Sequence, residues 1–149
     1  MTNNIIIYGA SGHGKVISDI ILEKKELNLF GFCDDNKRII GKKINNYLVH
    51  SFVNINSSIN IIMGIGNNII RKTIFERLIN QNFSFVSVVH PTCIESPSVK
   101  IGKGTVVMPG TIINSCTKIG DNCIINSSAC VDHDCRISNH SHVAPNATL

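Results

Sequence analysis

Hydrophobic residues in the first 90 positions form short runs that alternate with helical patterns, in which apolar residues recur at i, i+3 and i+4. Such runs, bounded by Gly, Asn or Pro, are typical of buried strands, and the helical spacing is typical of amphipathic helices. Strands are therefore expected in segments 4–14, 29–35, 59–68 and 83–91, and helices in segments 15–25 and 69–82. This alternation predicts an α/β unit, a small parallel sheet of about four or five strands with helices on its faces.

From residue 101 onwards the hydrophobic residues follow a period of six. The positions in phase are Ile101, Val107, Ile113, Ile119, Ile125, Val131, Ile137, Val143 and Leu149. Because nearly half of an average chain is apolar, nine hits in one phase have a chance probability of about one in a thousand. A second position, four residues after each of the first eight, is always small: Thr105, Thr111, Thr117, Cys123, Ala129, Cys135, Ser141 and Ala147.

A repeat of six residues with one large and one small inward position is typical of a parallel β-helix. Each hexad forms one side of a triangular coil, so about 18 residues close one turn, and successive coils stack roughly 4.8 Å apart. The second half of the chain is therefore predicted to fold as a β-helix of about two and two-thirds coils.

Charge and composition narrow the function classes only slightly. The formal charge of +4 is mild and no run of Lys or Arg exceeds two residues, so a nucleic-acid role has little support. The apolar run near the start is too short for a signal peptide, and no segment is long enough to span a membrane. We therefore expect a soluble cytoplasmic protein whose six cysteines are reduced.

The glycine-rich segment GASGHG follows the first strand and opens the first helix. Glycines at this place let backbone N–H groups approach an anionic phosphate, although a plain tight turn is the alternative. The G-x-x-G-x-G spacing differs from the G-x-G-x-x-G of dinucleotide-binding proteins, which weakens a nicotinamide interpretation. Asp34, twenty residues after Gly14, lies at the next strand end, where its carboxylate could accept hydrogen bonds from a ribose or a base.

A second turn at residues 64–67 ends the third predicted strand, and Gly64, Gly66 and Asn67 are expected to form another wall of the same site. Asn68 and Arg71 follow at the start of the next helix. Asn68 either contacts the ligand or caps the helix, and Arg71 either contacts the ligand or lies on the exposed face of the helix.

The segment 123–142 contains three histidines and three cysteines. A zinc site formed by Cys130, His133, Cys135, His140 and His142 has suitable ligand types. The repeat argues against it, because Cys123 and Cys135 occupy the small inward position whereas His133 faces outward or lies at a corner. A disulfide framework is typical of short secreted chains, so these two cysteines are better interpreted as interior fillers.

Several segments together resemble one family of enzymes. They are YGASGHGK (8–15), the Asp pair at 34–35, IGNNIIRK (65–72), the His-Pro pair at 90–91, and NSSACVDHDCRISNHSHVAP (126–145). In these segments the chain resembles bacterial hexapeptide-repeat sugar acetyltransferases of the sialic-acid O-acetyltransferase and UDP-4-amino-sugar N-acetyltransferase type. The resemblance implies a Rossmann-like nucleotide-sugar-binding domain over residues 1–90 and a left-handed parallel β-helix over residues 91–149. Family members continue for several more coils, so we expect this chain to be C-terminally truncated and its β-helix incomplete.

The resemblance also implies acetyl-CoA as co-substrate, no metal, and a homotrimer with each active site between neighbouring β-helices. His133 corresponds to the general base, and Asp134 stands where the family usually has Glu as the carboxylate that orients it. Asn126 and His142 are expected to contact acetyl-CoA, with an asparagine ladder and a surface histidine as the respective alternatives. The residues expected to bind the nucleotide-sugar are Gly9, Ser11, Gly12, His13, Gly14, Asp34, Asp35, Gly66 and Asn67.

The leading functional hypothesis is therefore acetyl transfer to the amine of a nucleotide-linked sugar in bacterial surface-glycan biosynthesis. O-acetylation of a sialic-acid-type sugar is the alternative within the class. A dinucleotide-dependent oxidoreductase would use only the first half of the chain, and a non-catalytic trimer that binds nucleotide-sugar would turn over no CoA.

Overall fold

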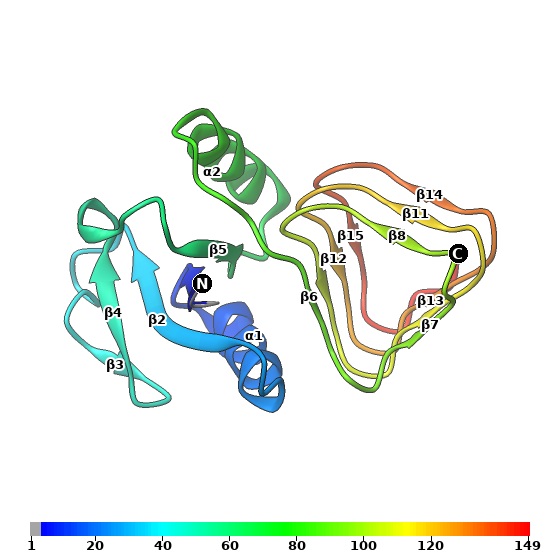
Figure 1. Cartoon of the computed structure of the whole chain (residues 1–149), viewed down its shortest axis with the longest axis horizontal. Coiled ribbons are helices and arrows are strands. Elements are labelled where there is room, and N and C mark those ends of the chain that lie inside the picture. Colours follow the sequence, from blue (N-terminus) through cyan, green and yellow to red (C-terminus); the bar gives the residue numbers. More distant parts are fainter. Residues whose placement is uncertain (1–3) are drawn as a thin grey trace. The chain divides into compact units, whose positions relative to one another are not determined.

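The computed structural model describes residues 4–149, which divide into a unit ending at Val86 and a second unit spanning Ser87–Leu149 (Figure 1). The strand Val88–Val89 pairs with Val106–Val107 and therefore belongs to the second unit. The sequence-based boundary after residue 90 would leave this strand in the first unit.

The first unit is a five-stranded sheet flanked by two α-helices. Its elements are β1 (Asn4–Tyr8), α1 (Gly12–Glu23), β2 (Asn28–Asp34), β3 (Lys43–Ile44), β4 (Tyr47–Ser51), the 3₁₀ turn η1 (Phe52–Asn54), β5 (Asn60–Met63) and α2 (Asn68–Asn80). The strand order is β3-β4-β2-β1-β5, and all neighbours are parallel except β3 and β4. Of the helices within residues 4–149, neither has the length and apolar character needed to cross a membrane.

The inner strand β1 is buried on both sides because both of its faces are apolar. Ile6 and Tyr8 pack in one cluster with Phe75 and Leu78 of α2. The alternate residue Ile7 lies against Gly14 of α1, where a Cβ would come 3.4 Å from the Ile7 side chain. The two helices therefore cover opposite faces of the sheet, as expected for a parallel sheet with continuous hydrophobic strands.

Two features of this unit differ from the pattern-based prediction. The predicted strand 83–91 is wrong as a single element, because Phe85 forms only an isolated bridge to Ile61 before the chain enters the β-helix. The pattern also missed the short hairpin of β3 and β4. Its strands lie at the edge of the sheet, where only Val49 is buried and apolar periodicity is weak.

The order of the strands creates one preferred ligand position in the first unit. From β1 the chain moves to β2 and β4 on one side, and then returns to β5 on the other side of β1. The loops that leave the carboxyl ends of β1 and β5 therefore diverge to opposite faces of the sheet. In open α/β sheets, ligands bind at this topological switch point.

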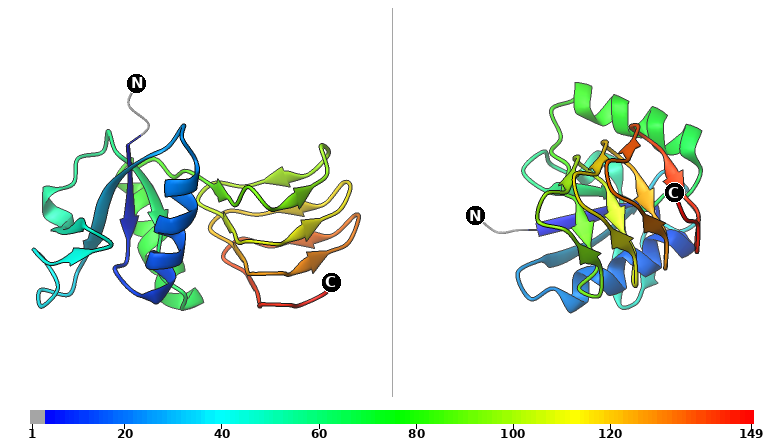
Figure 2. Two further views of the ribbon diagram at one scale, coloured as in Figure 1. Left: turned by 90° about the horizontal axis from the view of Figure 1, so that it is seen from below. Right: turned by 90° about the vertical axis from the view of Figure 1, so that its right-hand side faces the viewer.

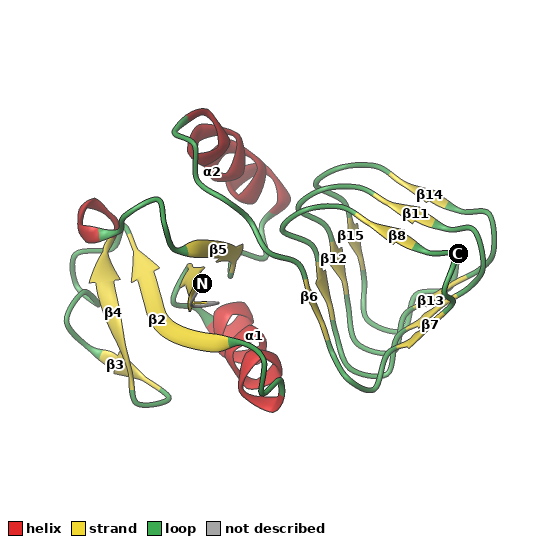
Figure 3. Ribbon diagram, in the orientation of Figure 1, coloured by secondary structure: helices red, strands yellow, loops and turns green. Residues whose placement is uncertain are grey.

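The second unit is a left-handed parallel β-helix, as predicted. Its two-residue strands are β6 (Val88–Val89), β7 (Ile94–Glu95), β8 (Lys100–Ile101), β9 (Val106–Val107), β10 (Ile112–Ile113), β11 (Lys118–Ile119), β12 (Ile124–Ile125), β13 (Cys130–Val131), β14 (Arg136–Ile137) and β15 (His142–Val143). They form three sheets, β6-β9-β12-β15, β7-β10-β13 and β8-β11-β14, on the three sides of the coils (Figure 3). The coils stack on one another (Figure 2).

The pairing register confirms the coil length inferred from the hexads. Ile112 pairs with Ile94 in one direction and with Cys130 in the other, a step of 18 residues each time. The large inward residues pack in a single core that includes Val107, Ile113 and Ile125, each at most 1% exposed.

The first five of the eight small inward positions are buried, Cys135, Ser141 and Ala147 are half-buried, and two of the threonines connect the coils. The Thr105 hydroxyl donates to the Gly120 carbonyl at 2.8 Å and accepts from the Cys123 amide at 3.0 Å. Thr117 does the same two sides further along, donating to the Asp132 carbonyl and accepting from the Cys135 amide. A hydroxyl is tolerated inside this core because it satisfies backbone groups at the corners of the next coil.

Each corner is made by one residue in the left-handed conformation. Positive φ recurs every six residues, at Gly104, Gly110, Cys116, Asn122, Ser128, Asp134, His140 and Asn146. Glycine, asparagine and aspartate adopt this conformation at the smallest cost, which explains five of the eight corner residues. The corner residue Asn122 is buried, whereas the side chains of Asp134 and its neighbour His133 are exposed and available for chemistry.

Candidate active site

The side chains of His133 and Asp134 contact each other at the corner between β13 and β14. Nδ1 of His133 lies 2.7 Å from Oδ2 of Asp134, and both side chains are exposed, at 66% and 72%. In an extended strand, two adjacent side chains would point to opposite faces. The left-handed conformation of Asp134, with φ of 59°, turns its carboxylate back toward the imidazole.

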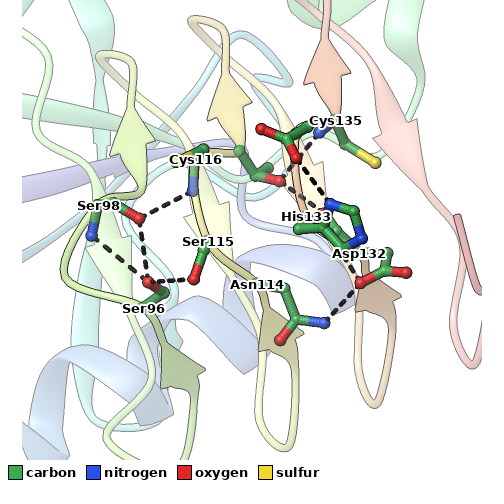
Figure 4. Close-up of polar contacts among 10 residues, drawn as sticks. Ser96, Ser98, Asn114, Ser115, Cys116, Asp132, His133 and Cys135 are labelled. Atoms are coloured by element: carbon green, nitrogen blue, oxygen red, sulfur yellow. Dashed lines mark hydrogen bonds and ion pairs between the residues drawn. The ribbon is translucent and has the colours of Figure 1, made fainter.

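The preceding coil holds this corner in place through four contacts (Figure 4). Thr117 contributes two of them, to the Asp132 carbonyl at 2.6 Å and from the Cys135 amide at 3.2 Å. The Asp134 amide donates to the Ser115 carbonyl at 2.9 Å. The side-chain amide of Asn114 donates to Oδ1 of Asp132 at 3.0 Å, and the same oxygen accepts the His133 amide at 2.8 Å. The backbone that carries His133 is therefore fixed although its side chain is exposed.

Two carboxylates change the proton affinity of the imidazole. The hydrogen bond that His133 donates to Asp134, with the charges of Asp132 and Asp134, raises the pKa of His133 above its ordinary value. The pKa of Asp132 is lowered, mainly because its carboxylate accepts the His133 amide and secondly because it accepts the Asn114 side chain. Sequence reasoning missed Asn114 and Asp132. Their signal was a spacing of 18 residues, one coil, which places them side by side.

Asn126 and His142 also lie together, one coil apart on the neighbouring side. The Asn126 amide nitrogen lies 2.9 Å from Nε2 of His142, and its Oδ1 accepts the Ser127 amide at 2.8 Å. The sequence interpretation as an asparagine ladder therefore does not describe this contact, which joins an amide to an imidazole.

The cysteines of the segment 123–142 are free thiols. Cys123 is buried, Cys135 packs against the same interior core, and Cys130 lies on a strand. Within residues 4–149, no group of three or more His, Cys, Asp and Glu side chains could hold a metal ion.

In the first unit, the predicted loop residues hold the switch point together. The carboxylate of Asp34 accepts the Ala10 amide at 2.8 Å and, through its other oxygen, the Asn36 amide at 2.8 Å. The Ser11 hydroxyl donates to the Gly64 carbonyl at 3.1 Å, which joins the loop after β1 to the loop after β5. Asp34 therefore binds the glycine loop itself, where the sequence interpretation placed a ribose or a base.

Glycine is required at three places in these loops. Gly9 has φ of 110°, and a Cβ on Gly64 would lie 2.5 Å from the Gly9 carbonyl oxygen. A Cβ on Gly14 would collide with the same oxygen. Around Gly12 and Gly66, by contrast, there is open space for a Cβ. The close approach of the two loops therefore explains the glycines at positions 9, 14 and 64. His13 lies in the first turn of α1, between Gly12 and Gly14, and is half-buried.

Asp35 belongs to a cluster that sequence reasoning did not predict. The Tyr8 hydroxyl donates to Oδ2 of Asp35 at 2.8 Å and accepts from Arg77 at 2.7 Å, while the Arg77 guanidinium lies 3.8 Å from the same carboxylate. Burial, followed by the hydrogen bond to Asp35, raises the pKa of the Tyr8 hydroxyl. Asp35 and Arg77 follow Tyr8 by 27 and 69 positions in the sequence, so no local motif could connect the three residues.

The residues at the start of α2 fix the loop that precedes this helix. Asn67 is the N-cap, because its side chain accepts the amides of Ile69 and Ile70, each at 3.0 Å. The interpretation of Arg71 as an exposed helix residue is wrong, since it is 1% exposed. Its guanidinium donates to the carbonyls of Ile65 and Gly66 and to the side chain of Asn68, so it fixes the loop from within.

Comparisons with known proteins agree with this architecture. The PglD N-terminal domain model matches residues 4–78, and the bacterial transferase hexapeptide (six repeats) model matches residues 98–133. UDP-N-acetylbacillosamine N-acetyltransferase from Bacillus subtilis is 36% identical over 110 residues, which are 70% of this chain and 51% of that protein. The chain thus spans about half the length of this curated relative.

Two solved structures have the same fold over nearly the whole chain. The acetyltransferase domain of PglB from Neisseria gonorrhoeae, in complex with acetyl coenzyme A, has a TM-score of 0.89 at 28% identity, covering 99% of this chain and 73% of that one. PerB from Caulobacter crescentus, in complex with CoA and GDP-perosamine, has a TM-score of 0.85 at 29% identity, covering 97% and 70%. The resemblance to hexapeptide-repeat sugar acetyltransferases is confirmed, and the chain belongs to the family defined by the PglD N-terminal domain, which it combines with a left-handed β-helix of transferase hexapeptide repeats.

Proposed function

We propose that the protein transfers the acetyl group of acetyl-CoA to the amine of a nucleotide-linked amino sugar in bacterial surface-glycan biosynthesis. The observation that carries the proposal is the hydrogen-bonded pair of His133 and Asp134 at an exposed corner of the β-helix. Support for the acceptor comes from the relatives, which are named as N-acetyltransferases of nucleotide-linked sugars or were solved with one. These names favour an amine over the hydroxyl of a sialic-acid-type sugar.

The pair assigns a tautomer to the imidazole. Because Nδ1 faces the Asp134 carboxylate, that nitrogen carries the proton, and the lone pair of Nε2 points to solvent. His133 is then a general base whose reactive nitrogen is accessible, and Asp134 orients the ring and stabilises the imidazolium.

The reaction needs one proton acceptor and later one proton donor. As the sugar amine forms a bond to the thioester carbonyl carbon, His133 accepts a proton from the nitrogen. When the carbon–sulfur bond breaks, the imidazolium returns this proton to the departing CoA sulfur. The base is regenerated, and the products are the acetamido sugar and free CoA.

Acetyl-CoA is proposed to contact Asn126 and His142. Their side chains lie 2.9 Å apart and, like His133, project from the outside of the β-helix. Both can donate hydrogen bonds to the amide and carbonyl groups of a pantetheine chain.

The nucleotide-sugar is proposed to bind the first unit at its switch point, with Gly9, Ser11, Gly12, His13, Gly14, Asp34, Asp35, Gly66 and Asn67 around it. The N-termini of α1 and α2 both begin there, and helix N-termini favour anionic phosphates. Asp34 and Asn67 would act indirectly, by holding the loops that present backbone amides.

A homotrimer is proposed as the working assembly, with the active sites between neighbouring β-helices. The outer face of β7 and β10 supports it, since Ile94 and Ile112 are 67% and 36% exposed on one flat sheet. A cytoplasmic location is proposed because acetyl-CoA is a cytoplasmic metabolite and all six cysteines are free thiols.

The test is release of free CoA thiol from acetyl-CoA with a panel of nucleotide-linked amino sugars, and with hydroxyl-only sugars as the alternative acceptors. Wild type is expected to react with an amine, and His133→Ala to lose about 100- to 10,000-fold in kcat/KM. The matched control is His50→Ala, in a half-buried histidine of β4 in the first unit. Equal rates for wild type and His133→Ala, both correctly folded, would contradict the assignment.

A further inference from the structure

The outer face of β8, β11 and β14 carries a column of three cations, one from each coil. Lys118 pairs in register with Lys100 on one side and with Arg136 on the other. Each cation precedes an inward isoleucine, so the three side chains point outward from the same sheet. Since strands in a sheet lie roughly 4.8 Å apart, the column spans about 10 Å.

Folding alone does not explain this column. Like charges directly opposite each other on neighbouring strands are destabilising. Within residues 4–149, no ion pair involves Lys100, Lys118 or Arg136. The repeat does not require charge here either, because the equivalent positions on the other two sides are apolar, with His142 as the exception. These positions are Val88, Val106, Ile124 and His142 on one side, and Ile94, Ile112 and Cys130 on the other.

The cations line a hollow of about 490 Å³ together with Ser98, Cys116 and Asp134. Three cations and one carboxylate give this lining a net charge of +2. The carboxylate of Asp134 is bonded to the imidazole of His133, so the hollow lies directly beside the proposed catalytic pair. The Ser98 hydroxyl accepts the Cys116 amide at 2.8 Å, which fixes the opposite wall (Figure 4).

We propose that this basic column binds the diphosphate group of a nucleotide-bearing substrate. A diphosphate diester carries two negative charges, which match the lining, and its oxygens suit two ammonium groups and one planar guanidinium on adjacent coils. The inference rests on the proposed function for the source of the ligand, because acetyl-CoA and a nucleotide-sugar both contain a diphosphate. The proposed anchor lies beside the corner that carries His133, because Asp134 lines the hollow and bonds this imidazole.

Binding of inorganic pyrophosphate, measured by calorimetry at low ionic strength, tests the column itself. Lys118→Met removes the central charge and keeps an apolar stem of similar length, and it is expected to weaken binding by about tenfold or more. The matched control Lys103→Met removes an exposed lysine of the same unit that does not line the hollow, and it should bind as wild type does. Equal binding by wild type and Lys118→Met would overturn the proposal.

Thermal unfolding provides a second measurement that does not depend on one variant. Without ligand, Lys118→Met and Arg136→Gln are expected to melt at or above the wild-type temperature, because each removes repulsion between neighbours. Pyrophosphate should raise the melting temperature of wild type more than that of either variant. Equal shifts in all three proteins would contradict the assignment.

Steady-state kinetics identify the source of the diphosphate. A raised KM for acetyl-CoA in Lys118→Met, with an unchanged KM for acetyl-pantetheine, identifies acetyl-CoA as the ligand. A raised KM for the nucleotide-sugar alone identifies the acceptor sugar. If wild type transfers acetyl groups and no KM changes, the column assignment is wrong and the proposed function stands. If the column binds pyrophosphate but no acetyl transfer occurs, the site stands and the proposed function is wrong.

Discussion

In the first unit, the side chains of Asp34, Asn67 and Arg71 bind the amides and carbonyls of irregular loops. In the second unit, the backbone of each coil pairs with that of the next, and Thr105 and Thr117 add contacts from inside. An irregular loop needs polar side chains to satisfy its backbone groups, whereas a repeat satisfies them mostly through its own ladder. The corner side chains of the repeat, such as His133, therefore remain available to solvent and substrate.

The largest effect is expected from a charge placed inside the regular β-helix. Ile113→Asp places a carboxylate in the interior core of the coils, where the residue is 1% exposed, and burial of an unpaired charge costs several kcal/mol. The second unit should lose its cooperative melt and its dispersed amide resonances. The control Lys103→Asp, at an exposed position of the same unit, should leave both intact. A normal melt for Ile113→Asp would contradict the register.

A smaller loss is expected when the loop of the first unit loses its anchor. Asp34→Ala removes the acceptor of the Ala10 and Asn36 amides and should lower the free energy of unfolding by about 1–3 kcal/mol. Hydrogen exchange of the Ala10 amide should accelerate. The control Asp19→Ala, at an exposed position on α1, should change stability little. Equal losses in both variants would show that Asp34 does not hold the loop.

Thr117 lies beneath the corner that carries His133, so its hydroxyl links the regular pairing of the coils to the proposed catalytic pair. Thr117→Val keeps the shape but leaves the Asp132 carbonyl and the Cys135 amide without this partner, at a cost of about 1–3 kcal/mol. We expect kcat to fall while the KM values stay near wild type, because the corner shifts and the binding surfaces do not. Thr105→Val, the same change at another corner, should cost similar stability and leave kcat unchanged. Matching kcat values for the two variants would refute the role of Thr117.

The same contrast explains what the sequence could predict. The six-residue period identified most inward residues of the β-helix from Ile101 onwards, because one register governs all coils. It missed Val89, Cys93 and Val99, which pack against the same core, and its last predicted inward position, Leu149, is 51% exposed. It placed His133 and Asp134 at a corner as well. The cluster of Tyr8, Asp35 and Arg77, and the burial of Arg71 under its loop, were not predictable, because they depend on how distant segments meet. The β3–β4 hairpin was missed since edge strands lack a strong apolar pattern.

The predicted strand 83–91 failed for an informative reason. Its apolar residues serve two different structures, since Phe85 bridges to β5 of the sheet while Val88 and Val89 begin the β-helix. A continuous hydrophobic run does not reveal that its partners change along its length.

The central claim is that His133 acts as a base held by Asp134, and the pH dependence of kcat/KM tests it most directly. The base must be neutral, and the carboxylates raise the pKa of His133 above 6.5, so the wild-type rate should fall as the pH decreases through that raised pKa. Asp134→Asn removes the largest of these influences. It should lower the maximum rate by at least about tenfold and move this acid limb to lower pH. Acid limbs at the same pH in both proteins would contradict the account.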